Sequence, residues 1–370
     1  MIKYILGFIF ISSSVYGQDT TRLSIMFVGD IMQHDSQIAA ACDTLTKNYD
    51  YTSCFQYIKP YLDSADMAIA NLEVTLAGSP YKGYPQFSAP DELLTTIKDV
   101  GVDVLVTANN HCVDRGRKGL ERTIMMLDSF NISHTGTFAD TVDRLNDYPL
   151  MVHQKGFALS VLNYTYGTNG ISVEKPNMVN LIDTVVIRKD LLKAKESNPD
   201  VIIVFMHWGS EYQSLPNKFQ KDITDFCFLH GAKLVIGSHP HVLQPMEWRK
   251  DTDQLVAYSL GNFVSGQRKR YTDGGAMLQV ELEKITLSDS STTHILNSNY
   301  QLEWVYRTSG RNRKYYILPT DKFESTLLET DVNLELPILP LTDKQSFKLF
   351  LDDSRALFKK HNLNIEEKKK

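Results

Sequence analysis

Short apolar runs rich in β-branched residues recur along the first two thirds of this chain, and segments with helical periodicity separate them. The clearest apolar runs are residues 23–28, 67–70, 102–107, 201–206 and 233–236. The helical patterns occupy residues 91–100, 116–130, 189–197 and 218–230. Strands that alternate with helices predict a layered α/β fold, and strands that are apolar almost throughout predict sheets buried on both faces.

The pattern changes after residue 241, where strands follow one another without helices between them. These runs are residues 255–260, 275–282, 301–307 and 314–318, and an amphipathic helical pattern then covers residues 342–361. We therefore expect a main domain over residues 18–290, a β-rich extension over residues 291–340, and a C-terminal helix and tail over residues 341–370.

The first 17 residues have the pattern of a secretory signal peptide. Lys3 precedes a short apolar run, and small residues precede an expected cut after Gly17. No later segment reaches transmembrane length, so we expect a soluble exported protein, periplasmic or extracellular. The net charge is −5 without a basic block, which argues against nucleic acid as a partner. In an exported protein Cys42 and Cys54 could pair, or they could remain free and half-buried.

Polar residues of a particular kind follow the apolar strands. They are Asp30, Glu73, Asn110, His207 and, in the segment IGSHPHV, both His239 and His241. In open α/β sheets, sites form outside the carboxyl ends of the strands. Each residue alone has an ordinary explanation, such as a helix cap or a turn. Together they indicate a metal site.

The types of ligand narrow the choice of metal. Two carboxylates, one amide oxygen and three imidazoles suit Mn²⁺, Fe²⁺ or Zn²⁺ better than Ca²⁺, which prefers oxygen ligands alone. Six ligands are too many for one catalytic zinc ion, but they suit two ions that share a carboxylate. Since residues two apart in an extended segment point the same way, we expect both imidazoles of His239-Pro240-His241 to reach this site. Pro240 should also favour an extended His239.

Six motifs, in the same order, resemble those of the CapA proteins of capsule and poly-γ-glutamate synthesis, a branch of the calcineurin-like metallophosphatase fold. They are FVGDIM (27–32), NLEVTL (71–76), ANNHCVDRG (108–116), MHWGSEY (206–212), IGSHPHVLQPME (236–247) and YSLGNFV (258–264). The resemblance implies a layered α/β/β/α sandwich with a β-rich C-terminal addition and a C-terminal helix. It implies a centre for two divalent ions, with Glu73 as the bridging carboxylate and with these further ligands: Asp30, Asn110, His207, His239 and His241. It also implies that His111 donates a proton and that Asp114 orients His111.

The sequence departs from the general metallophosphatase pattern at one position. Met32 stands where an Asp-x-His motif would have its histidine, so a one-metal site or a weakly held second ion stays open. His34 lies nearby and could substitute for the missing ligand. The segment from Tyr164 to Asn169 has the composition of a polar aromatic loop that could line a substrate groove.

The resemblance implies an exported metal-dependent hydrolase of capsule or cell-envelope polymer. Its partners would be an anionic envelope polymer or a phosphoester substrate, together with envelope synthesis proteins. Two alternatives remain: a non-catalytic, metal-stabilised accessory protein for polymer synthesis, export or anchoring, and a transferase that uses the same centre.

Overall fold

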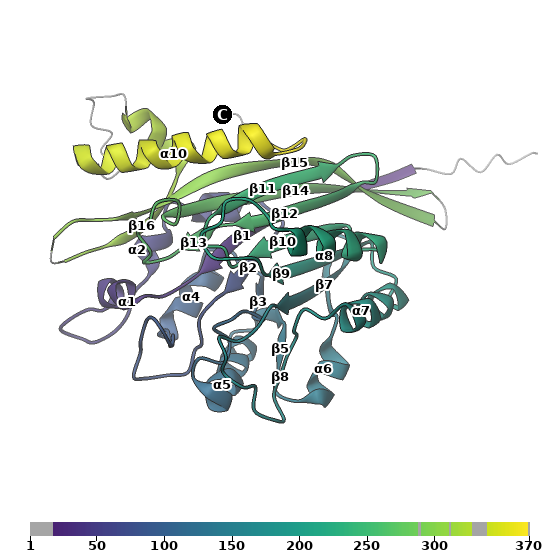
Figure 1. The fold of residues 1–370 in the computed structure, drawn as a ribbon, viewed down its shortest axis with the longest axis horizontal. Coiled ribbons are helices and arrows are strands. Elements are labelled where there is room, and N and C mark those ends of the chain that lie inside the picture. Colours follow the sequence, from purple (N-terminus) through teal and green to yellow (C-terminus); the bar gives the residue numbers. More distant parts are fainter. Residues whose placement is uncertain (1–17, 288–289, 311, 328–338, 369–370) are drawn as a thin grey trace, which may run out of the picture.

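Two β-sheets form the centre of the protein in the computed structural model, which describes residues 18–287, 290–310, 312–327 and 339–368 (Figure 1). The predicted signal peptide lies outside these residues. The strands of the larger sheet are, in spatial order, β16 (Tyr315–Pro319), β15 (Ser290–Arg307), β14 (Gly274–Leu287), β1 (Gln18–Ile31), β2 (Met67–Leu72), β3 (Val104–Val106) and β4 (Ser133–Thr135). Two short strands join it, β13 (Asn262–Val264) beside β1 and β17 (Glu366–Glu367) beside β15.

The second sheet has six strands. Their spatial order is β11 (Leu243–Arg249), β12 (Gln254–Leu260), β10 (Leu234–Ser238), β9 (Val201–His207), β7 (Phe157–Thr165) and β6 (Leu150–Gln154). In this sheet the four strands β12, β10, β9 and β7 are parallel to one another. In the larger sheet the four strands β1, β2, β3 and β4 are likewise parallel to one another. A small separate sheet pairs β5 (Thr137–Phe138) with β8 (Met178–Val179).

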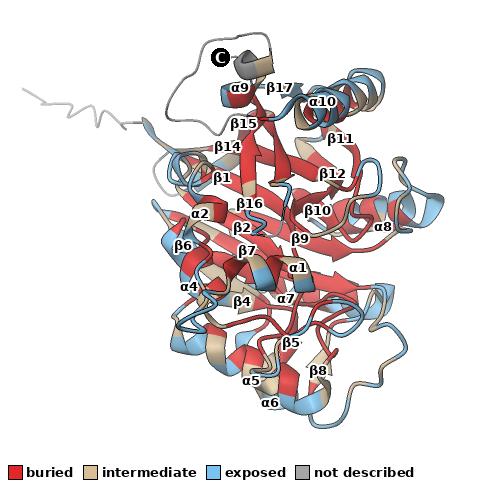
Figure 2. Ribbon diagram, turned by 90° about the vertical axis from the view of Figure 1, so that its left-hand side faces the viewer, coloured by how far each residue is buried: buried red, intermediate tan, exposed pale blue. Residues whose placement is uncertain are grey.

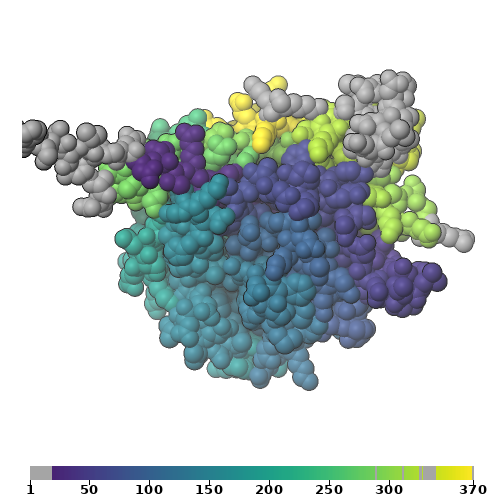
Figure 3. Space-filling model, turned by 180° about the vertical axis from the view of Figure 1, so that it is seen from behind, coloured from purple at the N-terminus to yellow at the C-terminus, as the bar shows by residue number. Residues whose placement is uncertain are grey.

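Helices cover the outer faces of the two sheets, so that the buried strands lie in the middle of the molecule (Figure 2). The larger sheet is covered by α1 (Asp35–Ala41), α2 (Thr52–Phe55), α3 (Lys59–Leu62), α4 (Glu92–Asp99) and α5 (Gly116–Ser129). The second sheet is covered by α7 (Thr184–Glu196) and α8 (Lys218–Leu229), and α6 (Thr141–Asp147) lies beside α7. Seen from behind, the surface is formed mainly by the first half of the chain (Figure 3).

Alternate residues of each central strand face opposite cores. In β1, Ile25 and Phe27 pack between the two sheets, whereas Met26 and Val28 pack under the helices of the larger sheet. Burying each such side chain contributes about 1.5–3 kcal/mol, so a strand with two apolar faces is stable only inside a sandwich. The predicted α/β/β/α arrangement, with β-rich C-terminal strands and a C-terminal helix, is confirmed.

The C-terminal segment closes one end of this sandwich. Helix α10 (Leu341–His361) follows β16 and two short helical turns, α9 (Thr320–Phe323) and η1 (Glu324–Leu327). It lies across β15 and β11, where Phe347 and Phe350 enter the core between the sheets (Figure 1). After α10, Leu363 exchanges backbone hydrogen bonds with β11, and β17 pairs with β15. One segment thus joins an edge strand of the second sheet to the larger sheet.

Two sequence-based expectations need correction or completion. Tyr164 and Thr165 are not in a loop; both are buried in β7, a strand that the sequence reading did not identify. All four cysteines are free, so Cys42 and Cys54 do not pair.

Among the described residues, no helix combines the length and apolar character needed to cross a membrane.

Gly29 allows two strands to approach closely beside the first motif. A β-carbon at this position would lie 2.0 Å from the Gly261 carbonyl oxygen, far inside van der Waals contact. This approach lets the neighbouring Asp30 amide donate to the same carbonyl at 3.0 Å. Glycine therefore fixes where the end of β1 meets β13.

We expect Gly29→Ala to lower the free energy of unfolding by about 2–3 kcal/mol, because the clash is with backbone that cannot move aside as a side chain would. Urea denaturation monitored by circular dichroism measures the effect. Gly167→Ala is the matched control, since its β-carbon would meet nothing within 4 Å. Equal midpoints for the two variants would show that Gly29 is not sterically constrained.

Candidate functional site

The carboxyl ends of the parallel strands of both sheets meet at one end of the sandwich, and the polar residues of the sequence motifs gather there. Asp30 lies at the end of β1, and Glu73 directly follows β2. Asn110 lies in the loop after β3. From the second sheet, His207 ends β9 and His239 follows β10. All five are buried, with at most 3% of any of them exposed.

Two groups of three side chains place their ligand atoms within 4.8 Å of one another. One group contains Glu73, His207 and His239, and the other contains Asp30, Glu73 and His241. In the first, His207 Nε2 lies 3.5 Å from Glu73 Oε1; in the second, His241 Nδ1 lies 3.3 Å from Asp30 Oδ2. Glu73 is the residue that the two groups have in common.

Asn71, which the sequence did not single out as a site residue, lies at the centre of these side chains. Its Nδ2 donates to Asp30 Oδ1 at 2.8 Å and lies 3.4 Å from Glu73 Oε2 and 3.3 Å from His207 Nδ1. Its Oδ1 accepts from Asn109 Nδ2 at 3.2 Å. Asn71 therefore holds side chains from both groups. The only signal for it in the sequence is its place near the end of strand β2, two residues before Glu73.

Burial determines the protonation of the site. Burial, followed by the charge of Asp30, raises the pKa of Glu73 well above its usual value. Burial and the neighbouring histidines lower the pKa of His207 well below its usual value. Burial, followed by the charge of His241, lowers the pKa of His239 to about 3. Both imidazoles are therefore neutral at physiological pH, the form in which histidine binds metal.

The donor set fits a divalent cation. Glu73 Oε1 and His239 Nδ1 are buried without a hydrogen-bond partner, and buried polar atoms of native proteins are rarely left so. Among the described ion pairs, only histidines lie opposite Asp30 and Glu73, and no lysine or arginine does. Two buried carboxylates beside neutral imidazoles are compensated well by bound cations.

The loop after β3 adds an amide and a histidine–carboxylate pair. Asn110 Oδ1 lies 2.8 Å from His207 Nε2, so the amide oxygen faces the first group. His111 Nδ1 lies 2.7 Å from Asp114 Oδ2, which also accepts from the Phe87 backbone amide at 2.7 Å. The Phe87 ring packs edge-on against His111 with the ring centroids 4.6 Å apart. The His111 ring is thus held on two sides.

The backbone of the HPH segment differs from the expectation. His239 has φ +96° and His241 has φ +57°, so neither residue is extended, and the argument from residues two apart in a strand is wrong. Both rings nevertheless reach the site, with centroids 6.0 Å apart. Tertiary contacts impose this strained backbone: the His239 amide points at Asp30 Oδ2 at 3.3 Å, and Pro240 accepts from the Tyr212 amide at 2.8 Å.

Further residues orient the histidines. Ser238 Oγ lies 2.9 Å from His207 Nδ1, and Asn262 Oδ1 lies 3.1 Å from His241 Nδ1. His34, which the sequence offered as a substitute ligand, belongs to neither three-residue group. Its Nδ1 accepts from the Gly266 amide at 3.1 Å, and burial lowers its pKa to about 4. The His34 ring is thus engaged by the backbone of the segment that follows β13.

Two tyrosines lie at the mouth of the site. The Tyr166 ring is 4.5 Å from the His239 ring, and the Tyr212 ring is 6.3 Å from the His241 ring. Asn169 Oδ1 accepts from Asn110 Nδ2 at 3.1 Å, which ties the loop after β7 to the site. Of the predicted polar aromatic loop, the part from Tyr166 to Asn169 thus lies at the rim.

Comparison with known proteins identifies a family. Residues 24–267 match the family described as bacterial capsule synthesis protein PGA_cap. The capsule biosynthesis protein CapA of Bacillus anthracis is 30% identical over 281 residues, covering 72% of this chain and 65% of that protein. The PGA biosynthesis protein CapA of Bacillus subtilis is 29% identical over 274 residues, covering 71% and 68%. The matched region thus spans about two thirds of each relative's length.

Solved structures with similar folds are more distant. The calcineurin-like phosphoesterase YfkN of Bacillus subtilis has a TM-score of 0.44 and 14% identity, over 91% of this chain and 100% of that one. A 5'-nucleotidase of Candida albicans has a TM-score of 0.42 and 12% identity, over 90% and 58%. Likeness at this level says nothing about chemistry, whereas the sequence match covers well over half of the chain. The protein therefore belongs to the bacterial capsule synthesis protein PGA_cap family.

Proposed function

We propose that this protein is a metal-dependent hydrolase of the metallophosphatase type that acts in capsule or cell-envelope polymer metabolism. The observation that carries the proposal is the place of Glu73 in two groups of buried ligand atoms, beside a histidine–carboxylate pair. The bond cleaved would be a phosphoester, or an amide or related linkage in an envelope polymer. The names of the two CapA relatives support a role in capsule or PGA biosynthesis.

The ligands in this proposal follow the two groups. Glu73, His207 and His239, with the nearby Asn110 oxygen, would hold one ion. Asp30, Glu73 and His241 would hold the other. Mn²⁺, Fe²⁺ and Zn²⁺ all suit this mixture of oxygen and nitrogen. When bound, such ions supply Lewis-acid activation of water and of a substrate oxygen.

His111 is the residue that would move a proton. Its Nδ1 is taken by the Asp114 carboxylate, which leaves Nε2 as the nitrogen that can exchange a proton with substrate. Asp114 is itself fixed by the Phe87 amide, so the imidazole cannot rotate freely. In this role His111 protonates the leaving group, and Asp114 holds the ring in the orientation for the transfer.

Export is part of the same proposal. The N-terminal pattern of a signal peptide with a cut after Gly17 would place the mature protein in the periplasm or outside the cell. An anionic envelope polymer or a phosphoester there would be its substrate, and envelope synthesis proteins its partners.

The test is hydrolysis of chromogenic substrates by the purified protein. Bis(p-nitrophenyl) phosphate, p-nitrophenyl phosphate and γ-glutamyl-p-nitroanilide cover diester, monoester and amide bonds. We expect turnover of at least one after loading with Mn²⁺, Fe²⁺ or Zn²⁺, loss of turnover with a chelator, and recovery when metal is restored. A protein that binds metal yet cleaves none of the three would favour the accessory role.

A further inference from the structure

Asn262 joins the loop between β13 and β14 to the candidate metal centre. Asn262, whose Oδ1 faces His241 Nδ1, donates from Nδ2 to the Thr272 carbonyl at 2.9 Å and lies 3.2 Å from Gln267 Oε1. Within the loop, Thr272 donates to the Lys269 carbonyl through both its amide and its hydroxyl, at 3.1 and 2.9 Å. The position of Lys269 is therefore tied to that of a proposed metal ligand.

Lys269 extends toward the mouth of the site. Its Nζ lies 3.9 Å from the centroid of the Tyr212 ring, and that ring is 6.3 Å from the His241 ring. Tyr212 is held by hydrogen bonding of its amide to the Pro240 carbonyl. Burial, followed by the charge of Glu211, raises the pKa of Tyr212 to about 12, so the ring beneath the ammonium stays neutral. A cation over such a ring is stabilised without losing its charge.

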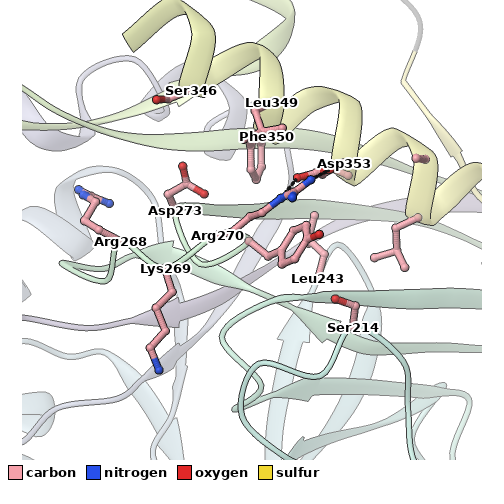
Figure 4. Close-up of a pocket in the computed structure, with 14 residues that line it drawn as sticks. Ser214, Leu243, Arg268, Lys269, Arg270, Asp273, Ser346, Leu349, Phe350 and Asp353 are labelled. Atoms are coloured by element: carbon pink, nitrogen blue, oxygen red, sulfur yellow. Dashed lines mark hydrogen bonds and ion pairs between the residues drawn. The ribbon is translucent and has the colours of Figure 1, made fainter. Parts of the chain in front are cut away.

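Arg270, the residue that follows Lys269 in the loop, has an ion-pair partner. Arg270 turns to α10 and forms a two-pronged ion pair with Asp353, at the edge of a cavity of about 520 Å³ (Figure 4). Lys269 also lines this cavity, but in Figure 4 its side chain extends in a different direction from that of Arg270. Among the ion pairs of the described residues, none involves Lys269. Its ammonium group therefore lies over the Tyr212 ring, beside the site, without an ion-pair partner among the described residues.

We propose that Lys269 is a specificity residue that binds a second negatively charged group of the substrate, away from the bond that is cleaved. This inference rests on the proposed function, because it takes the metal centre as the place where the reacting group binds. The Tyr212 ring sets the distance between the Lys269 ammonium and the metal centre. Asn262 links the loop that carries Lys269 to the proposed ligand His241. A substrate with repeated anionic groups would then bind better than one with a single charge.

The chain offers a matched control for this lysine. Lys250 also lies over an aromatic ring, with Nζ 4.6 Å from the Trp248 centroid, and like Lys269 it is exposed. It follows the far end of β11, whose seven residues span about 20 Å from the side of His241. Lys250→Met therefore removes the same charge and the same kind of contact at a distance from the site.

The experiment compares the affinities of hexaglutamate and hexaglutamine, labelled with the same dye, for the metal-loaded protein by fluorescence anisotropy. We expect hexaglutamate to bind more tightly, Lys269→Met to weaken its binding about two- to fivefold, as for one screened ion pair, and Lys269→Arg to restore it. Lys250→Met and the affinity for hexaglutamine should not change.

Metal content, measured on the same samples, separates this inference from the proposed function. If the protein holds metal and Lys269→Met binds hexaglutamate as tightly as the unaltered protein, the role of Lys269 is overturned and the metal centre stands. Equal weakening by Lys250→Met would also overturn it, since the effect would then be one of net charge. Absence of metal after loading would instead contradict the proposed function.

Discussion

Replacing Glu73 with glutamine is expected to remove both metal ions, not one. Glu73 is the only residue shared by the two groups of ligand atoms, and glutamine keeps its shape while losing the charge and one oxygen donor. Elemental analysis should give about two ions per chain for the loaded unaltered protein, as in two-metal hydrolases, and background for the variant. Glu73→Gln should still fold, because the substitution also relieves the repulsion between two buried carboxylates.

Glu211→Gln is the control for this measurement. Glu211 is an exposed carboxylate four residues after His207 and belongs to neither three-residue group. Its replacement should leave the metal content unchanged. One ion retained by Glu73→Gln would show that the two groups do not depend on a common carboxylate, and would favour the one-metal site that Met32 left open.

Replacing His111 with alanine is expected to lower turnover about 10²- to 10⁴-fold while metal content stays at the unaltered level, since general acid catalysis contributes about that much. His111 is in neither three-residue group, and its Nδ1 is engaged by Asp114. Asp114→Asn should lower turnover as well, because the amide can hold the ring in the wrong tautomer. Steady-state kinetics and elemental analysis on the same preparations check both expectations.

His134 provides the comparison for His111. Its Nε2 lies 3.0 Å from Asp128 Oδ1, so it forms a similar histidine–carboxylate pair, but on β4 at the edge of the larger sheet. His134→Ala should leave turnover unchanged. If His111→Ala keeps full turnover, the proton comes from elsewhere and the assigned role of His111 is wrong.

The alternation of strands and helices was predictable because each of these elements carries its own periodicity. Strands β1, β2, β9 and β10 and helices α4, α5 and α8 follow the expected segments within a few residues at most ends. Strand β7 was missed because polar residues interrupt it, and their partners are distant in sequence. Asn163 Oδ1 accepts from the Ala108 amide at 2.6 Å, and the Tyr164 hydroxyl donates to Asp190 at 2.9 Å. Those contacts exist only once the sheet has formed.

The site was predictable in its residue types but not in its geometry. Carboxylates and histidines at strand ends are local features of the sequence, and the structure brings them to one place. The central role of Asn71 depends on partners 41 and 136 residues away, so no local pattern reports it. The left-handed backbone of His239 and His241 is likewise imposed by contacts from Asp30 and Tyr212. Local propensity argued for the opposite conformation.

The closure of the sandwich by its C-terminal segment bears on how the chain folds during synthesis. The second sheet and every proposed metal ligand precede residue 290, yet Phe347 and Phe350 of α10 fill the core, and Leu363 and β17 bind the two sheets together. A chain emerging from the ribosome holds its ligands long before this core is sealed. Until α10 and β17 have been synthesised, the growing chain exposes apolar surface between its sheets. Synthesis of α10 therefore supplies the side chains that close the core between the two sheets.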